Sequence, residues 1–242
     1  MNSVLCPLIL RVAIVYSKDE TLAEIGKIQF WRHRIDVGHG IVTPGRNDTD
    51  HDVAYLSLPE DMTGKRVLDI GCSDGYFSFL CEERGAEVVS VDHVPGLPGK
   101  PGQHGFRVAA KLRGSQARFH WLSVYDMNKI DGAFDIILFL NVLYHLKHPL
   151  LALENIYGKL VEGGEMYLKT FFYQDFRYGK YGFDIFRKSL CRFYEKNELN
   201  NDYSNWWTPN KRCLEGMIRC TGFRDVRFLA RYSDRLYYKT RK

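Results

Sequence analysis

Two acids and the glycine-rich stretch between them carry the clearest chemical signal in the sequence. Asp69 and Gly71 stand in the stretch VLDIGCSDGYF, and Asp92 follows the next apolar run along the chain. Glycines let the backbone turn sharply and approach a ligand closely. An acid at the end of the second strand of a nucleotide-binding fold can accept hydrogen bonds from the ribose hydroxyls. Asp74, inside the turn, disfavours a pyrophosphate and favours a cationic ammonium or sulfonium group.

The local pattern also predicts the elements that hold these residues. Residues 67–70 form a short apolar run typical of a buried strand, and residues 76–84 repeat apolar side chains with helical spacing. Strand, turn and helix in this order open a nucleotide-type α/β fold, in which the free N–H groups at the helix start can face an anionic group. The acid in the turn favours S-adenosylmethionine (SAM) over a dinucleotide. The predicted cofactor-binding residues here are Asp69, Gly71, Cys72, Ser73, Gly75, Tyr76, Phe77, Asp92 and His93.

Alternating strand and helix patterns continue to the end of the chain. The further predicted strands are 87–91, 117–125, 134–140, 165–172, 225–232 and 236–240, and the predicted helices are 19–30, 106–113, 149–160 and 209–220. Asp19 and Thr208 are the expected caps of the first and last of these helices. This order predicts an α/β fold with a Rossmann-like, doubly wound, seven-stranded sheet, mostly parallel with one antiparallel strand.

The polar residues directly after the predicted strand 134–140 are the candidates for catalysis. Open α/β sheets bind ligands outside the carboxyl ends of their strands, where Asn141, Tyr144 and His145 follow. A histidine is the natural base for removing a proton from an acceptor near neutral pH. We expect His145 to be that base, with His33 as the second candidate; a structural histidine bonded to the backbone is the alternative for His145. No residue cluster in the sequence is typical of a metal site, and no metal is predicted.

Two aromatic-rich segments are predicted to enclose the site. Residues 31–48 read as an active-site lid, with a strap packed on the sheet edge as the alternative. Residues 173–208 read as a long aromatic insert, and connections of that length usually have a function. The predicted substrate contacts are Trp31, Arg46, Trp206 and Trp207. The expected organisation is an N-terminal helix and lid over residues 1–55 and a SAM-binding domain over residues 56–242.

The composition is that of an ordinary globular protein. The 242 residues are 45% hydrophobic and 26% charged, with a net charge of +5. Residues 177–242 hold 16 Lys and Arg against 7 Asp and Glu, but these charges are spread, so a solvated surface is preferred over a nucleic-acid site. The six cysteines include no C-x-x-C pair, which favours a reducing, cytoplasmic compartment. Residues 4–16 are apolar but too short to span a membrane, and we expect them to pack on the domain.

Several stretches resemble a known group of enzymes. VLDIGCSDGYFSF is similar to motif I of the class I SAM-dependent methyltransferases. FWRHRIDVGHGIVTPG, NVLYHLKHPL and NWWTPNKRCLEGMIRCTGF resemble the tRNA wobble-uridine (5-oxyacetic acid/methoxyuridine) methyltransferase-like family. The resemblance implies SAM as the donor, or carboxy-SAM, whose extra carboxylate the tRNA enzymes hold with a tyrosine and basic residues. Tyr144 matches that tyrosine, whereas no basic partner is evident in the sequence.

The resemblance also implies the remaining contacts of the cofactor. In class I methyltransferases a polar group after the third strand reaches the adenine amino group. Asp126 is the matching residue here, supported by the backbone of Val124 and Tyr125. Asn141, Val142 and Tyr144 are expected to complete the cofactor site.

These observations predict a SAM-dependent methyltransferase that methylates a hydroxyl of a small molecule by in-line transfer, with a histidine as general base. The alternative is a tRNA wobble-uridine-modifying (carboxymethyl or methyl) transferase, which agrees with the family resemblance and the basic last quarter of the chain. A SAM-binding protein without catalysis is a third hypothesis. The expected partner is therefore a small-molecule acceptor, with tRNA second and no membrane, and the sequence leaves monomer and dimer open.

Overall fold

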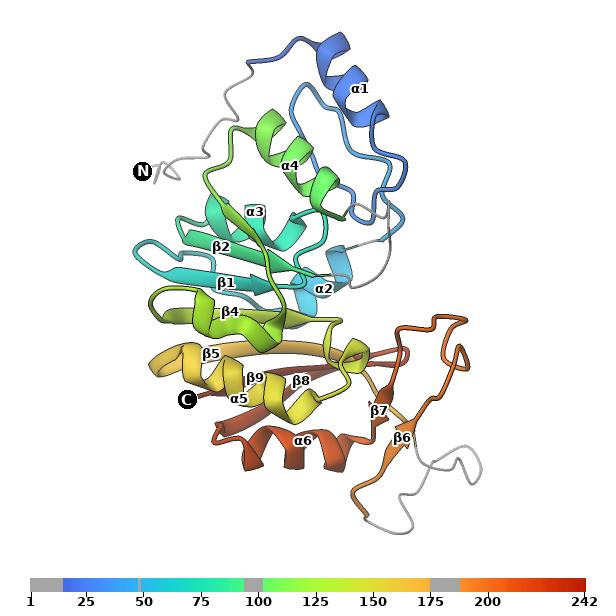
Figure 1. The fold of residues 1–242 in the computed structure, drawn as a ribbon. Helices are drawn as coiled ribbons and strands as arrows, with labels where there is room; N and C mark the ends of the chain where they lie inside the picture. Colours follow the sequence, from blue (N-terminus) through green and yellow to red (C-terminus); the bar gives the residue numbers. More distant parts are fainter. Residues whose placement is uncertain (1–14, 48, 94–101, 175–187) are drawn as a thin grey trace, which may run out of the picture.

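A seven-stranded sheet runs through the molecule (Figure 1). The computed structural model describes residues 15–47, 49–93, 102–174 and 188–242. The strands of the sheet are β1 (Arg66–Ile70), β2 (Glu87–Asp92), β3 (Arg118–Trp121), β4 (Phe134–Leu140), β5 (Leu160–Phe171), β8 (Arg224–Tyr232) and β9 (Arg235–Arg241). Their order is β3-β2-β1-β4-β5-β9-β8. The pairs from β3 to β5 are parallel and β9 is antiparallel to both its neighbours, which confirms the predicted fold class.

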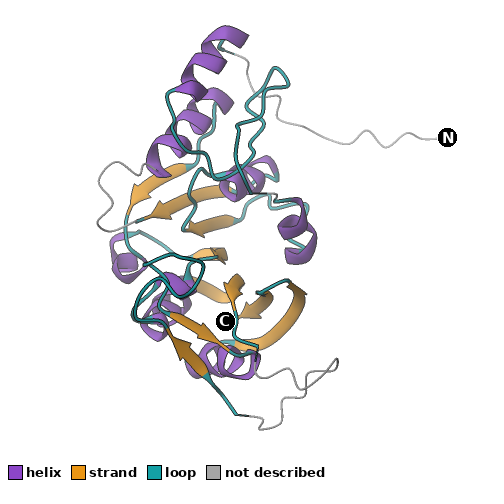
Figure 2. Ribbon diagram, turned by 90° about the vertical axis from the view of Figure 1, so that its right-hand side faces the viewer, coloured by secondary structure: helices purple, strands orange, loops and turns teal. Residues whose placement is uncertain are grey.

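Helices cover both faces of this sheet (Figure 2). They are α1 (Lys18–Gly26), α2 (Asp50–Leu56), α3 (Tyr76–Glu83), α4 (Gly102–Arg113), α5 (Pro149–Lys159) and α6 (Lys211–Cys220), with short 3₁₀ turns η1 (Val124–Lys129) and η2 (Leu143–His145). α5 and α6 pack on one face of the central strands, and α2 and α3 pack on the other. The molecule is therefore doubly wound, as the alternation of elements predicts.

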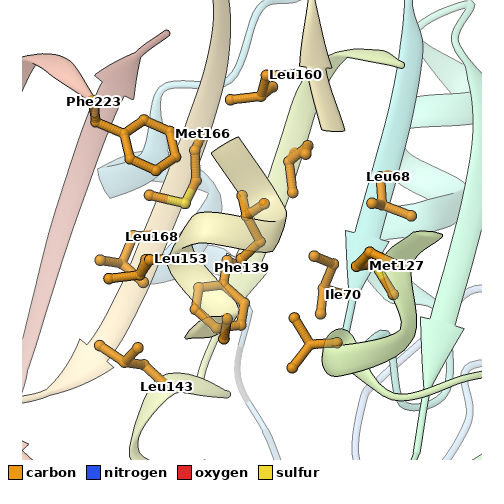
Figure 3. Packing of buried hydrophobic residues seen from close by; sticks show 14 of the residues in the cluster. Leu68, Ile70, Met127, Phe139, Leu143, Leu153, Leu160, Met166, Leu168 and Phe223 are labelled. Carbon is orange, nitrogen blue, oxygen red and sulfur yellow. The ribbon is translucent and has the colours of Figure 1, made fainter. Parts of the chain in front are cut away.

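The alternation of side chains along each strand gives each face its own core. In β1, Leu68 and Ile70 join the cluster on the α5 and α6 side, whereas Val67 joins the cluster on the α2 and α3 side. Figure 3 shows the first cluster, where Leu68 lies in the same packed layer as Phe139 and Leu153. Burial on both faces explains why the central strands read as continuous apolar runs in the sequence.

Several predicted boundaries differ from the structure, and three of them have a clear local reason. The first helix is capped by Ser17, which forms a reciprocal capping box with Glu20, and not by Asp19. The last helix is capped by Asn210, whose side chain accepts the Cys213 N–H, because Thr208 is buried in a short strand. The third strand ends at Trp121, and its predicted continuation turns into η1.

Two features of the structure had no prediction. α2 precedes the first strand, and the insert contains an antiparallel pair, β6 (Cys191–Phe193) and β7 (Trp207–Pro209). The predictions for residues 4–14, and parts of the predicted loop 93–105 and insert 173–208, lie outside the described residues. The insert and the segment between α1 and α2 both extend to the edge where the parallel strands end (Figure 1).

Candidate functional site

The turn after β1 is held in a conformation that favours glycine. Gly71 and Gly75 have φ angles of 76° and 94°, and Ser73 between them has a φ of 51°. The N–H of Gly71 donates to the Val91 carbonyl at 2.8 Å, which joins the turn to the end of β2. α3 begins directly after this turn, so its free N–H groups face the carboxyl edge of the sheet.

Gly71 is also required by a close contact. A Cβ on Gly71 would lie 2.3 Å from Cγ2 of Val142, at the end of β4. A Cβ on Gly75 would lie 2.7 Å from the rings of Phe79 and Phe106. The turn after β1 and the residues that follow β4 are therefore in contact, with no room for a side chain on Gly71. Glycine at both positions is therefore required by the packing of the turn against these side chains.

Asp92 lies at the end of β2, beside the same turn. Its Oδ2 accepts the Ser73 N–H at 2.8 Å. Burial raises the pKa of Asp92, and backbone N–H groups from Ser73 and His93 oppose that effect. The structure thus brings together the glycine turn and the acid predicted for the ribose, and the contact of Asp92 with a cofactor stays a prediction.

Asp69 occupies a different position from the one expected of a ligand contact. It is buried, and its Oδ2 accepts the Ser78 hydroxyl of α3 at 2.6 Å. The Ser90 hydroxyl donates in turn to Ser78. Burial raises the pKa of Asp69 to about 7, while the Ser78 hydroxyl opposes that effect. Asp69 fixes α3 onto β1 and β2 beneath the turn, and Phe77 and Cys72 are also buried in the core.

Asp74 connects the turn to a segment far away in the sequence. Its Oδ2 accepts the backbone N–H groups of Arg32 at 2.5 Å and His33 at 3.0 Å. Asp74 is almost fully buried, and a Cβ on Gly105 of α4 would lie 2.6 Å from its Oδ1. The carboxylate predicted to face a cationic ligand therefore anchors residues 31–47 to the site instead.

Residues 31–47 form an ordered strap. Alternate side chains of the strap are buried, and Thr43 N–H donates to the Ile35 carbonyl. Trp31 is only 3% exposed, packs in the core with Phe79 and Phe106, and donates its indole N–H to the Ile25 carbonyl. The prediction that Trp31 binds substrate is therefore wrong, because its ring is used for packing.

His33 is the buried histidine of this strap. Its ring centroid lies 6.0 Å from that of Tyr76 and 6.4 Å from that of Phe77. Its Nδ1 is buried, with no hydrogen-bond partner among the described residues. Burial, with repulsion from Arg32 and Lys169, lowers the pKa of His33 to about 3. His33 is therefore neutral at physiological pH.

The end of β4 carries a cluster of polar and aromatic groups. Asn141 has a φ of 60°, and its Oδ1 accepts a hydrogen bond from Nε of Arg235 at 3.2 Å. The Arg235 guanidinium lies 5.7 Å from the ring centroid of Tyr144 and packs on Phe171. Tyr144 is buried, which raises its pKa to about 12. Arg235 is a basic partner of Tyr144 that lies 91 residues along the chain, so it could not be located from sequence.

His145 follows Tyr144 and is oriented by the insert. Its Nδ1 lies 2.9 Å from the Ser204 hydroxyl and 3.2 Å from the Ser204 carbonyl. The Ser204 hydroxyl donates to Oδ1 of Asp202 at 2.6 Å. A hydroxyl that donates to a carboxylate accepts from the imidazole, so Nδ1 carries the proton and Nε2 is the basic nitrogen. Burial lowers the pKa of His145, although Asp202 opposes it.

The remaining predicted cofactor residues differ in how far they are buried. Val124 is buried, whereas the Asp126 side chain is 44% exposed and pairs with Lys129 at 2.9 Å. His93 and Trp121 bring their rings to 5.3 Å at the β2 and β3 edge. The adenine contact of Asp126 stays a prediction.

The other three predicted substrate contacts, Trp206, Trp207 and Arg46, also stay predictions. Trp206 and Trp207 are half-buried and pack against Phe193, and the Trp206 N–H donates to the Tyr144 carbonyl at 2.8 Å. Arg46 is exposed, with its guanidinium 5.8 Å from the Phe30 ring. Their contacts with a substrate stay predictions, and the insert packs on the loop that carries His145.

Within the described residues, no three His, Cys, Asp or Glu side chains gather closely enough to hold a metal ion. A search of the same residues finds no helix with the length and hydropathy needed to cross a membrane.

Comparison with known families decides the class of the protein. Residues 45–213 match the family described as "Methyltransferase domain". The chain belongs to this family. The family match confirms the predicted methyltransferase and agrees with the seven-stranded fold.

The methyltransferase is similar in sequence to curated proteins named tRNA U34 carboxymethyltransferase. It is 30% identical to the protein from Campylobacter hominis over 70% of this chain and 54% of the relative. It is 32% identical to the protein from Helicobacter acinonychis over 69% of this chain and 58% of the relative. The chain thus spans somewhat more than half the length of these relatives.

Solved structures show the same fold at low sequence identity. The N-terminal domain of EvdMO1, crystallised in the presence of SAH and D-fucose, has a TM-score of 0.67 and 16% identity, covering 94% of this chain and 97% of that domain. The 1,6-didemethyltoxoflavin-N1-methyltransferase from Burkholderia thailandensis has a TM-score of 0.53 and 20% identity, covering 78% and 74% of the two chains.

The contact between Gly71 and Val142 gives a matched test. Gly71 and Gly64 have nearly equal φ angles of 76° and 74°, but a Cβ on Gly64 would meet nothing within 4 Å. Alanine at either position costs about 1–2 kcal/mol in backbone strain, and only Gly71→Ala adds the clash. We expect Gly71→Ala to weaken SAM binding by more than about tenfold and Gly64→Ala to leave it unchanged, measured by calorimetry. Equal SAM affinities in the two variants would contradict a role for the Gly71–Val142 contact in shaping the cofactor site.

Proposed function

We propose that this methyltransferase transfers the methyl group of SAM to a hydroxyl of a small molecule, with His145 as the general base. The observation that carries the proposal is the hydrogen-bonded series His145, Ser204 and Asp202 at the carboxyl end of β4. It fixes the tautomer of the imidazole and leaves Nε2 as the basic nitrogen. A lowered pKa keeps the ring neutral at physiological pH, as a base requires.

The residues around the glycine turn would hold the cofactor. The Asp92 carboxylate would accept the ribose hydroxyls, and the backbone from Gly71 to Gly75 would line the amino-acid end. When bound, SAM supplies an electrophilic methyl group on a cationic sulfur. Val142 contacts this turn, and the ring of Tyr144, two residues later, lies 4.3 Å from that of His145. Asn141 and Tyr144 would therefore align an acceptor for in-line transfer.

The two segments over the carboxyl edge support a small acceptor. Asp74 anchors the strap on one side, and the insert packs on the His145 loop on the other. Enclosure of this kind excludes water and orients a small substrate. The structural neighbour crystallised with D-fucose lends support to a sugar-like acceptor. Action of the strap as a lid, and a division of the chain at residue 55, are part of the proposal.

Replacement of His145 tests the base. We expect His145→Gln to lower the rate of methyl transfer by about 10²–10⁴-fold without changing SAM affinity, whereas His148→Gln, at an exposed ring three residues on, changes neither. The wild-type rate should fall only below pH 6.5, because the pKa of His145 is lowered from that value. Histidine ring NMR titration checks the same pKa. A His145 that titrates above 6.5, or a variant of full activity, contradicts the assignment.

Carboxymethyl transfer to tRNA is the second candidate, and Arg235 is the observation that favours it. A guanidinium beside Tyr144 offers the basic partner that an extra carboxylate on the cofactor would need. Arg32 adds a second positive charge close enough to act on Tyr144 and Asp92. The curated relatives named tRNA U34 carboxymethyltransferase give further support.

Calorimetry with the two cofactors separates the candidates. If the second candidate holds, the wild type should bind carboxy-SAM more than about tenfold tighter than SAM, and Arg235→Met should remove that preference while SAM affinity is kept. Small-molecule methylation predicts no preference for carboxy-SAM in the wild type, and Arg235→Met then changes nothing in the ratio of the two affinities.

A further inference from the structure

A polar cavity of about 200 Å³ lies where β5 ends and β9 begins. Its lining comes from α2, β5 and the β8–β9 hairpin, so none of it belongs to the glycine turn or to the His145 loop. The cavity is smaller than the ~300–1,000 Å³ typical of sites for drug-sized ligands. It therefore has room for one ring and not for a whole nucleotide.

The floor of the cavity is a buried ion pair. Nζ of Lys169 lies 2.6 and 2.7 Å from the two carboxylate oxygens of Asp52, and the Tyr237 hydroxyl donates to the same carboxylate at 2.6 Å. Lys169 and Tyr237 stand opposite each other in the β5–β9 ladder. Lys169 and Asp52 are only 9% and 8% exposed. A buried pair of this kind contributes little net stability, so its place at a cavity favours a binding role.

This floor retains hydrogen-bonding capacity. An ammonium group has three protons, and within the described part of the chain both hydrogen bonds of the Lys169 Nζ go to Asp52. A carboxylate offers about four acceptor positions, and the three donated bonds leave at least one. Burial lowers the pKa of Lys169 while Asp52 opposes that effect, and the pair offers a donor and an acceptor side by side.

The wall of the cavity is aromatic. The rings of His51 and Tyr232 stack at 4.7 Å with an interplanar angle of 25°, and Tyr55 lies 5.7 Å from Tyr232. Tyr232 is 43% exposed, so part of this platform is open to a ligand. A flat ring face above a polar floor suits a ring with apolar C–H or π faces and polar edges.

Arg235 connects the cavity to the reaction site. It lines the cavity, donates to Asn141, and lies over the ring of Tyr144. The ring of Tyr144 in turn lies 4.3 Å from that of His145. A ring held in the cavity would therefore contact Arg235, which joins the cavity to the groups proposed to align and deprotonate an acceptor.

We propose that this cavity is the acceptor subsite and takes an uncharged six-membered ring with vicinal hydroxyls. The lining contains two cations, Lys169 and Arg235, and two carboxylates, Asp52 and Asp234, so it has no excess charge to attract an anion. Vicinal hydroxyls donate to the Asp52 carboxylate and accept from Lys169, and the ring face packs on Tyr232. This inference rests on the proposed methylation of a small hydroxyl and names its substrate class.

Ligand-observed NMR on the full chain, saturated with S-adenosylhomocysteine, tests the subsite. D-fucose and catechol are the probes, because they present the same vicinal hydroxyls on a saturated and an aromatic ring. Tyr232→Ser removes the exposed platform. Phe228→Ser is the matched control, since Phe228 lies on the same strand, is 40% exposed and packs near Lys211, outside the cavity. The double variant Asp52→Asn with Lys169→Gln replaces the floor by a neutral pair.

We expect at least one probe to bind the wild type, and the probe that binds tells a sugar from a phenol. Tyr232→Ser and the double variant should weaken it by about tenfold, and Phe228→Ser should leave it unchanged. Cofactor affinity, measured by calorimetry, should stay constant. Binding of neither probe, or equal effects of the two serine variants, overturns the subsite. If the wild type does not bind the cofactor at all, that result would instead contradict the proposed function.

Discussion

The carboxylate of Asp74 holds the two halves of the site together. It accepts the backbone N–H groups of Arg32 and His33, which lie about 40 residues earlier in the chain. Backbone donors to a buried carboxylate are strong and directional. This contact adds two hydrogen bonds to the apolar packing of the strap around Cys72, and it fixes the backbone of Arg32 and His33 beside the turn.

Several residues of the site have a backbone conformation or a protonation state that lowers the stability of the fold. Ser73 and Asn141 take left-handed backbone angles, which non-glycine residues rarely adopt. His33 is buried as a neutral ring, with its Nδ1 unpartnered within the described residues. Apolar cores on both faces of the sheet offset these costs, since the strands that end at the site bury most of their side chains. Stability from the core therefore permits a strained, polar edge.

Local patterns predicted what is local in the structure. β1, the turn and α3 follow each other within twenty residues, so strand, glycine and helix signals were enough to find them and Asp92. The mostly parallel direction of the strands followed from the alternation of elements, whereas their order in the sheet had no prediction. The end of β3 was wrong because the Ser123 side chain accepts the Tyr125 N–H and starts a 3₁₀ turn, a contact that a run of strand-forming residues conceals.

Long-range contacts explain what the sequence could not predict. Trp31 looked like a substrate contact because it stands among polar residues, yet the fold packs it against α4. Asp74 reads as a ligand contact until its partners in the strap are known. The links from His145 to Ser204 and from Asn141 to Arg235 join residues 59 and 94 positions apart. A single sequence carries no signal for such pairs.

The most direct test of the account is calorimetric titration of the full chain with SAM, repeated on Asp92→Ala and on Asp61→Ala. Asp61 is a matched exposed acid whose carboxylate accepts the Thr63 N–H before β1. Because a hydrogen bond to a charged group contributes about 1.5–3 kcal/mol, we predict at least about a tenfold loss of affinity in Asp92→Ala and none in Asp61→Ala. Wild-type binding that survives Asp92→Ala unchanged, or no binding of SAM at all, would contradict the assignment of the cofactor site.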